Sequence, residues 1–234
     1  MSLIPINLQA VRQQIVHAAQ RADRSFTEIQ LLAVSKTFDA DAVLIAATAG
    51  QEAFGENYVQ EAVDKIATIA RIAPELRLEW HFIGPIQSNK TRQIAENFAW
   101  VHSVDRLKIA QRLAEQRPHG MAALNVCLQI NISGEDTKSG VQPEQALQLA
   151  RDVAQLPNLR LRGLMAIPQP TDDPALQRHN FAQLRLLKQQ LVEAGVAIDT
   201  LSMGMSSDME AAIMEGSTIV RVGTAIFGKR DYAQ

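Results

Sequence analysis

The sequence predicts an α/β protein whose 234 residues form a single (β/α)₈ TIM barrel, spanning 1–234, with an extra N-terminal helix. Short runs rich in β-branched residues alternate with longer helical patterns, and such alternation implies parallel strands joined by helices. Eight strand-like runs in one chain favour a closed barrel, which usually takes about 250 residues. The alternative is an open doubly wound sheet. It is disfavoured because no Gly-x-Gly-x-x-Gly follows the first strand.

The predicted elements follow one another in regular order. An opening helix is expected from about residue 7 to 21, where Leu8, Val11, Ile15 and Ala18 recur at helical spacing. The eight strands are expected at Leu31–Thr37, Glu52–Asn57, Glu79–Gly84, Trp100–Val104, Asn125–Ser133, Leu159–Ile167, Thr200–Gly204 and Ile219–Phe227. The intervening helices are expected near 39–49, 58–71, 89–97, 106–116, 143–155, 174–194 and 208–214. Because the chain nearly ends after strand eight, the opening helix is expected to take the place of the last helix.

The fifth strand predicts a polar barrel interior. Its apolar residues fall on one face and its polar residues on the other: Val126, Leu128, Ile130 and Ile132 against Asn125, Cys127, Gln129, Asn131 and Ser133. The apolar face is expected to pack on the surrounding helices. The polar face would then point inward, where burial requires hydrogen bonds or a polar ligand.

Composition narrows the function classes. The chain is 47% apolar and carries a formal charge of −2, without the basic stripe that nucleic-acid binders show. No apolar run is long enough to span a membrane, and the N-terminus shows no secretory signal. The lone cysteine, Cys127, excludes an internal disulfide, and the five histidines (17, 81, 102, 119 and 179) lack metal-site spacing. We therefore expect a cytoplasmic protein without metal, nucleic-acid or membrane partners, its histidines structural or on the surface.

Three residues of predicted strands could carry chemistry, and two of them lie at carboxyl ends, where barrel enzymes place their functional residues. Lys36 ends the first strand, where desolvation would lower the pKa of its amine and make it nucleophilic. Asn57 closes the second strand and is either a helix N-cap or a ligand contact. Arg221 points inward from the eighth strand, so it needs either a carboxylate, Glu210 or Glu56, or an acceptor on a ligand.

The segments after strands seven and eight could bind a phosphate. The first combines a Gly/Ser loop at residues 204–207 with a helix start, although Ser207 and Glu210 also fit a capping box. In the second, Gly223 would let the backbone approach a ligand closely. A further loop, residues 134–140, is either a solvated loop or a lid that brings Lys138 as a second amine.

An imine-forming lysine, a phosphate cradle and an inward arginine together suggest pyridoxal 5′-phosphate (PLP), which has an aldehyde, a phosphate and a ring nitrogen. From the residues alone, an imine-forming aldolase acting on a sugar phosphate fits nearly as well.

A resemblance to a known family adds to this interpretation. The segments LLAVSKT (31–37), FGENYVQE (54–61), EWHFIGPIQSNK (79–90), RLRGLMAIP (160–168), LSMGMSSDMEAAI (201–213) and VRVGTAIFG (220–228) closely resemble the bacterial pyridoxal phosphate homeostasis proteins. The resemblance implies an alanine-racemase-like barrel that holds PLP as an imine on Lys36. It also implies that Ser206, Gly223 and Thr224 hold the phosphate, that Arg221 meets the pyridine nitrogen and that Asn57 lies near the ring. Ser207 stands where an acidic residue is common in the family.

The resemblance further implies a PLP-binding protein without turnover. An arginine at the ring nitrogen disfavours its protonation and weakens the ring as an electron sink. Racemases of this fold add a second domain that supplies a tyrosine base, whereas this chain has only Tyr58 and Tyr232 and stops soon after its last strand. We expect a monomer involved in vitamin B6 homeostasis, with PLP-dependent apo-enzymes as further partners. A PLP-dependent amino-acid racemase is the alternative.

Overall fold

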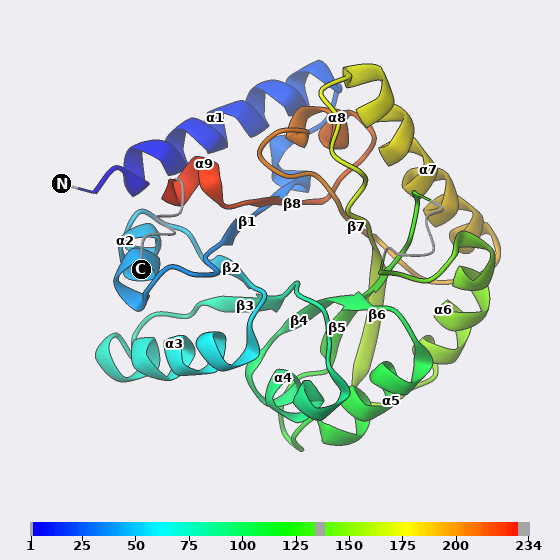
Figure 1. The fold of residues 1–234 in the computed structure, drawn as a ribbon, viewed down its shortest axis with the longest axis horizontal. Helices are drawn as coiled ribbons and strands as arrows, with labels where there is room; N and C mark the ends of the chain where they lie inside the picture. Colours follow the sequence, from blue (N-terminus) through cyan, green and yellow to red (C-terminus); the bar gives the residue numbers. More distant parts are fainter. Residues whose placement is uncertain (1, 134–138, 229–234) are drawn as a thin grey trace.

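The computed structural model describes residues 2–133 and 139–228, so Lys138 and Tyr232 lie outside the described residues. Within these residues eight parallel strands close into a barrel in chain order, each paired with the next and β1 paired with β8 (Figure 1). The strands are β1 (Gln30–Val34), β2 (Ala53–Glu56), β3 (Glu79–Phe82), β4 (Trp100–Val104), β5 (Leu124–Gln129), β6 (Leu159–Met165), β7 (Thr200–Ser202) and β8 (Ile219–Val222). The predicted (β/α)₈ barrel is confirmed.

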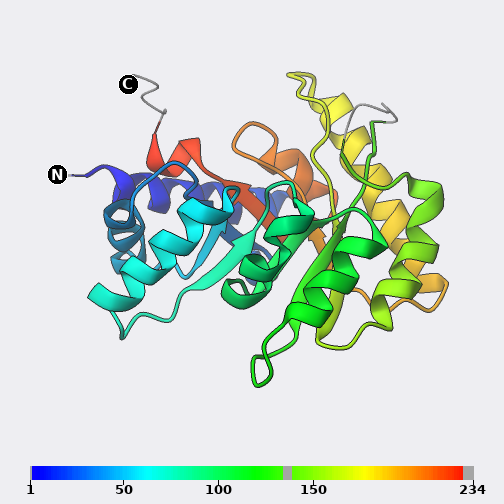
Figure 2. The ribbon, with the colours of Figure 1, turned by 60° about the horizontal axis from the view of Figure 1, so that its bottom comes forward.

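Helices surround the barrel on its outside (Figures 1 and 2). They are α1 (Ile4–Arg21), α2 (Ala40–Thr48), α3 (Val59–Ile72), α4 (Thr91–Asn97), α5 (Leu107–Gln116), α6 (Ala146–Ala154), α7 (Pro174–Glu193), α8 (Met209–Met214) and α9 (Thr224–Phe227). Short 3₁₀ turns lie at Phe26–Glu28 (η1), Ser88–Lys90 (η2) and Pro143–Gln145 (η3). Helix α1 buries Leu8, Val11, Ile15 and Ala18 and packs against α2, α8 and α9. It therefore takes the place of the last barrel helix, as predicted.

Several strands end earlier than predicted, because turns and a helix begin at the carboxyl rim. After β1, the N–H of Phe38 donates to the carbonyl of Ser35 and closes a turn. After β8, the carbonyl of Gly223 accepts from the N–H groups of Ile226 and Phe227, which starts α9. The predicted strand from 219 to 227 was therefore wrong in its second half. The loop after β7 and helix α9 both lie at the upper rim in Figure 2.

The core has two apolar parts, separated by the strands. The larger part lies between strands and helices and contains Val126, Leu128 and Ile130 of β5 and the segment after it. The smaller part fills the barrel interior, and its buried residues come from six different strands: Leu32, Ala53, Trp100, Cys127, Met165 and Ile219. Cys127 therefore faces the interior and its apolar neighbours face the helices, as the alternation in this segment predicts.

No helix in the described ranges is long and apolar enough to cross a lipid bilayer.

Gly163 in β6 offers a test of the tight packing between neighbouring strands. A Cβ atom at this position would collide with the backbone carbonyl of Thr200 in β7. We expect Gly163→Ala to lower the free energy of unfolding by about 1–3 kcal/mol, the usual cost of overpacking. The measurement is urea denaturation followed by circular dichroism.

Gly55→Ala in β2 is the matched control. The atoms nearest to a Cβ there would be side-chain carbons of Leu32 and Ile83, at 3.1 and 3.2 Å, which can shift. Equal losses of stability in the two variants would contradict the assignment of a backbone collision at Gly163.

Candidate functional site

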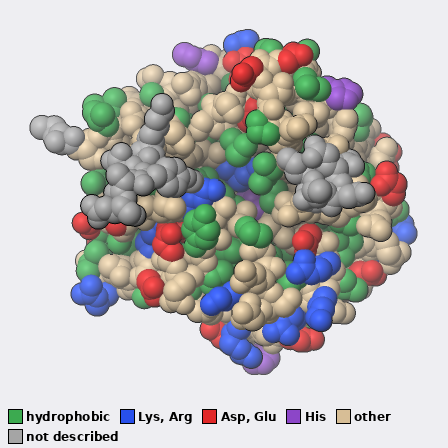
Figure 3. All heavy atoms as spheres, viewed as in Figure 1, with side chains coloured by type: hydrophobic (Ala, Val, Ile, Leu, Met, Phe, Trp, Pro, Cys, Tyr) green, Lys and Arg blue, Asp and Glu red, His purple; other side chains and the backbone are tan. Residues whose placement is uncertain are grey.

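A cavity of about 320 Å³ lies at the carboxyl ends of the strands. It is lined by all six residues that the sequence singled out, Lys36, Asn57, Ser206, Arg221, Gly223 and Thr224. Apolar side chains of Val34, Phe38, Ile83, Ile167 and Met205 form much of the remaining wall. Figure 3, drawn in the view of Figure 1, shows a hollow near the middle of this face with Lys or Arg atoms inside it. Volumes from about 300 Å³ upward suit small-molecule ligands.

The backbone around Lys36 is fixed by hydrogen bonds on both sides of the residue. The carbonyl of Ser35 accepts from Nζ of Lys65 at 2.9 Å. On the other side, the N–H of Thr37 donates to a carboxylate oxygen of Glu61 at 2.6 Å. Thr37 has a φ of 69°, a left-handed conformation that non-glycine residues rarely adopt. These bonds hold an otherwise unfavourable turn and so fix the direction in which the lysine leaves the strand.

A buried ion pair lies behind this turn. Nζ of Lys65, in α3, contacts Oε1 of Glu56 at 2.6 Å, and the two side chains are 4% and 0% exposed. The same oxygen accepts from the hydroxyl of Ser35 at 2.6 Å. Burial raises the pKa of Glu56, while the charge and hydrogen bond of Lys65 lower it. The pair therefore links α3 and β2 to the end of β1, and the sequence analysis missed it because no motif marks it.

Asn57 is a cavity residue and not a helix cap. The residue that precedes α3 is Tyr58, which makes no side-chain capping bond. A Cβ atom on Gly84 would collide with the backbone of Asn57, so the glycine permits the close approach of the two rim segments. Oδ1 of Asn57 is buried and has no hydrogen-bond partner among the described residues. Such an orphaned polar atom in a cavity wall indicates a site for a polar ligand.

The segment after β7 forms a different turn from the capping box that Ser207 and Glu210 suggested. The residue before α8 is Asp208, whose carboxylate accepts from the N–H of Met205 at 2.6 Å. Glu210 instead forms an ion pair with Arg21 at 2.6 Å. Ser206 and Ser207 are thus left on the cavity wall.

Arg221, in β8, is buried, and its protein partners are neither of the two carboxylates, Glu210 and Glu56, that the sequence offered as one of its alternatives. Nη1 donates to the carbonyl and the hydroxyl of Ser202, at 2.6 and 2.7 Å, and Nη2 donates to the carbonyl of Ala166 at 3.0 Å. Glu56 pairs with Lys65 instead, because it lies behind the end of β1. A guanidinium has five N–H groups, and three are used by these bonds. The other donors are available to a ligand in the cavity that Arg221 lines.

The hydroxyl of Ser202 leads to two further residues that the sequence did not single out as functional. It lies 2.7 Å from Nδ1 of His102, and Nε2 of His102 lies 2.9 Å from Nδ1 of His81. Both histidines are fully buried inside the barrel, whereas His17, His119 and His179 are exposed. The histidines are therefore structural or on the surface, as predicted, but two of them belong to the surroundings of Arg221.

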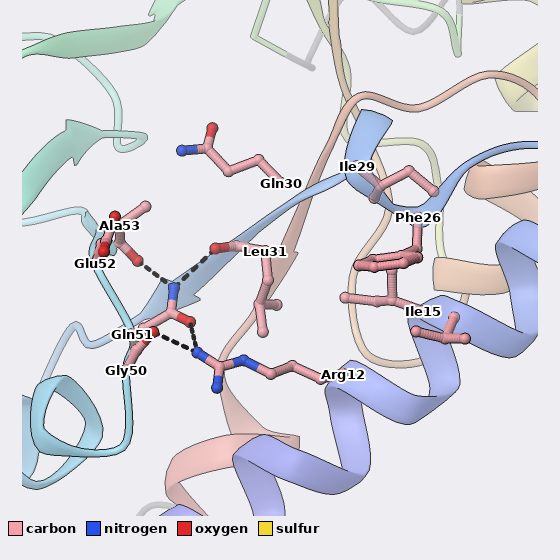
Figure 4. Close-up of a pocket in the computed structure, with 11 residues that line it drawn as sticks. Arg12, Ile15, Phe26, Ile29, Gln30, Leu31, Gly50, Gln51, Glu52 and Ala53 are labelled. Carbon is pink, nitrogen blue, oxygen red and sulfur yellow. Dashed lines mark hydrogen bonds between the residues drawn. The ribbon is translucent and has the colours of Figure 1, made fainter.

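A second cavity, of about 330 Å³, lies at the opposite end of the barrel between α1, η1 and the beginnings of β1 and β2 (Figure 4). Its arginine is engaged by the protein: the guanidinium of Arg12 donates to the carbonyls of Ala49 and Gly50 and to the side-chain oxygen of Gln51. The amide of Gln51 in turn donates to the carbonyls of Leu31 and Ala53. The cavity at the carboxyl ends is the better candidate, because it holds both Lys36 and Arg221.

Neither metal nor thiol chemistry has a site in the described part of the chain. No group of three or more His, Cys, Asp or Glu side chains there could hold a metal ion. Burial raises the pKa of the Cys127 thiol to about 12, so the thiolate form is scarce at neutral pH.

Comparison with known proteins connects this chain with a family. The model of the alanine racemase N-terminal domain matches residues 6–231. The pyridoxal phosphate homeostasis protein of Pseudomonas aeruginosa is 61% identical over 232 residues, which cover 99% of this chain and 98% of that protein. The structure of PipY from Synechococcus elongatus with PLP bound is 36% identical, with a TM-score of 0.82 over 96% of this chain and 100% of that chain.

An alanine racemase from Clostridium difficile shares the fold. It is 18% identical, with a TM-score of 0.69, and the match covers 95% of this chain but 57% of that one. The alanine-racemase type of barrel that the sequence predicted is therefore confirmed.

The Lys65–Glu56 pair generates a stability prediction. We expect Lys65→Met to lower the free energy of unfolding by about 3–5 kcal/mol, because it leaves a buried carboxylate without its counter-ion. Urea denaturation followed by circular dichroism measures this loss. Lys108→Met, on the exposed face of α5, is the control and should change stability by about 0.5 kcal/mol or less. A loss as small as that of the control would show that the ion pair does not support the rim.

Proposed function

The chain belongs to the family of pyridoxal phosphate homeostasis proteins, built on the alanine racemase N-terminal domain, and from this premise we propose that it binds PLP in the cavity at the carboxyl ends of its strands. One observation carries the proposal: a single cavity combines a lysine, an arginine, an unpartnered amide oxygen and the loops after β7 and β8. These groups match the aldehyde, the ring nitrogen and the phosphate of PLP.

Each group has a proposed role. The amine of Lys36 forms an imine with the aldehyde carbon of PLP and releases water. The N–H donors of Arg221 that remain after its three protein bonds meet the unprotonated pyridine nitrogen, and Asn57 lies beside the ring. Ser206, Gly223 and Thr224 hold the phosphate through hydroxyl and backbone N–H groups. A Cβ atom on residue 223 would come within 3.2 Å of the carbonyl oxygen of Val34, so this position favours glycine. Glycine in turn lets the backbone N–H approach a ligand closely.

We propose that the protein holds PLP without catalytic turnover. Racemisation requires a base on each face of the cofactor, and Lys36 and Arg221 are the ionisable groups among the described residues that line the cavity. Tyr58 is 53% exposed and lies outside that lining. Burial lowers the pKa of Arg221 to about 10, so the guanidinium stays protonated at neutral pH and cannot act as the second base.

The role that follows is in PLP homeostasis inside the cytoplasm. A reversible imine keeps the reactive aldehyde out of solution and still permits its release to PLP-dependent apo-enzymes. The protein would act as a monomer, since the whole set of proposed contacts comes from one chain.

The covalent tie is tested by Lys36→Ala. The variant should lose the chromophore that borohydride fixes to the protein, because the imine with Lys36 is its source. Weak PLP binding should remain, because the phosphate contacts persist and each hydrogen bond to a charged group contributes about 1.5–3 kcal/mol. Absorption spectra before and after dialysis, with and without inorganic phosphate as competitor, measure both effects.

The matched control is Lys138→Ala, which removes the other amine that the sequence suggested. It should keep the full chromophore. If Lys36→Ala kept the imine and Lys138→Ala lost it, the anchor would be Lys138, and our assignment of Lys36 would be wrong. A folded Lys36→Ala that binds no phosphate compound at all would contradict the cradle at Ser206, Gly223 and Thr224.

The absence of turnover is tested with single-enantiomer amino acids. Incubation of the PLP-loaded protein with pure L- or D-alanine should give no sustained appearance of the other enantiomer, because a second base is lacking. Chiral chromatography over many hours provides the measurement, with an alanine racemase as the positive control. Continued racemisation that disappears in Lys36→Ala would establish the racemase alternative.

A further inference from the structure

A chain of hydrogen-bonded side chains crosses the barrel interior, from the cavity to the opposite end. It runs from Arg221 in β8 to Ser202 in β7, His102 in β4, His81 in β3 and Glu79 at the start of β3. The four heavy-atom distances are 2.7, 2.7, 2.9 and 2.8 Å, which lie in the range of good hydrogen bonds. Ser202, His102 and His81 are fully buried, whereas the side chain of Glu79 is 40% exposed.

The two ends of this chain determine the direction of every bond. A guanidinium can only donate, so the hydroxyl oxygen of Ser202 accepts from Arg221. The carboxylate of Glu79 can only accept, so Nε2 of His81 carries a hydrogen and donates to it. Nδ1 of a neutral His81 is then an acceptor and takes a bond from Nε2 of His102. Nδ1 of His102 accepts in turn from the hydroxyl of Ser202, and all four bonds point from Arg221 towards Glu79.

The charge states fit this direction. Burial lowers the pKa of both His81 and His102, which keeps both imidazoles neutral near pH 7. The hydrogen bond from His81 lowers the pKa of Glu79 to about 2, so its carboxylate is charged. The ring of His81 stacks on Trp100 at 5.3 Å with the planes 4° apart, which fixes its orientation. The chain therefore has a cation at one end, an anion at the other, and neutral groups between them.

We infer that Ser202, His102 and His81 are positioning residues that hold Arg221 towards the cofactor's ring nitrogen, and that Glu79 is the carboxylate that orients them from the far end of the barrel. The inference rests on the proposed function for the role of Arg221. Within the described residues, no carboxylate forms an ion pair with the guanidinium within 4 Å. Asp208 acts on it only through its charge, and Oδ1 of Asp208 accepts from the N–H of Met205. A carboxylate in direct contact could take both of the remaining donors and leave none for the ring nitrogen.

The experiment compares three variants of the full-length, PLP-loaded protein. Ser202→Ala breaks the chain next to Arg221. Glu79→Gln keeps an acceptor oxygen beside His81 but removes the charge. Glu52→Gln is the matched control (Figure 4). This exposed carboxylate lies at the same end of the barrel, beside the start of β3, and does not belong to the chain of hydrogen bonds. The readouts are the absorption maximum of the imine and the rate at which PLP dissociates into a trapping apo-enzyme.

We expect Ser202→Ala to accelerate PLP dissociation about tenfold, as expected for one bond to a charged group. Glu79→Gln should accelerate PLP dissociation about threefold and move the absorption maximum in the same direction as Ser202→Ala. Glu52→Gln should match the wild type in both. Wild-type behaviour of both Ser202→Ala and Glu79→Gln would overturn the inference, and so would equal effects of Glu79→Gln and Glu52→Gln, which would mean a general charge effect.

A second measurement needs no PLP and remains decisive if Ser202→Ala does not fold. Nitrogen-15 NMR of the histidine rings in the PLP-free wild type should show neutral Nε2–H tautomers for His81 and His102 near neutral pH. In Glu79→Gln the Nε2 resonance of His81 should shift, while Glu52→Gln should leave it in place. An imidazolium or an Nδ1–H tautomer at either histidine would refute the direction of the chain.

Failure of the inference differs from failure of the proposed function. If the wild-type protein forms no imine that borohydride can fix, the proposed function is wrong. If it forms one that depends on Lys36 but is indifferent to Ser202 and Glu79, then only the inference is wrong.

Discussion

The pairing of β1 with β8 is the constraint on which the rest of the site depends. In this register Leu32 lies opposite Arg221 and Ala33 opposite Val222. Because the strands are parallel, the segments that follow them leave the barrel side by side at the same rim. Lys36 thus becomes a neighbour of Arg221 and of the turn at Gly223, although they are nearly the length of the chain apart in sequence. In an open sheet with the same strand order they would lie at opposite edges.

Closing the barrel also creates an interior in which polar groups must find partners, since burial without a hydrogen bond is costly. The structure meets this requirement in different ways behind β1 and inside the barrel. Behind β1 the charge of Lys65 is neutralised in direct contact with Glu56, and the pair supports the backbone next to Lys36. Inside the barrel Arg221 contacts only neutral oxygens. A direct ion pair suits a group that supports a turn, whereas neutral partners leave a guanidinium with donors for a ligand.

The sequence predicted the barrel, the role of the first helix and the inward face of the fifth strand, because each depends on local periodicity. Strand ends were predicted too long because a turn closed by Phe38 and a helix begun at Gly223 depend on backbone bonds that no side-chain pattern shows. The six cavity residues were brought together by strand order, a property of the whole fold that the predicted alternation already contained.

The partners of Arg221 could not be found in the same way. Carboxylates were the only protein partners considered for it, beside an acceptor on a ligand, and His81 and His102 were judged by metal-site spacing along the chain. Their contacts join residues 21 and 100 positions apart, so only the closed barrel brings them together. A signal was nevertheless present in the alternation along each strand. Glu79 and His81 share one face of β3, and Ser202 lies on the opposite face of β7 from Leu201, which packs against the helices. Applying the argument made for the fifth strand to all strands would have placed these polar residues inside.

The direction of the buried chain bears on what the cofactor can do in such a site. Each group from Arg221 to His81 already donates towards Glu79, so no link has a proton to pass towards the cavity unless all four bonds reverse. Reversal would set an Nδ1–H tautomer of His81 with its Nε2 lone pair against the Glu79 carboxylate, which is repulsive. The guanidinium, for its part, would have to give up a proton that its pKa of about 10 retains at neutral pH. The ring nitrogen of bound PLP would therefore stay a hydrogen-bond acceptor, a poor electron sink. An interior arranged in this way supports the proposal that the protein retains the cofactor without turnover.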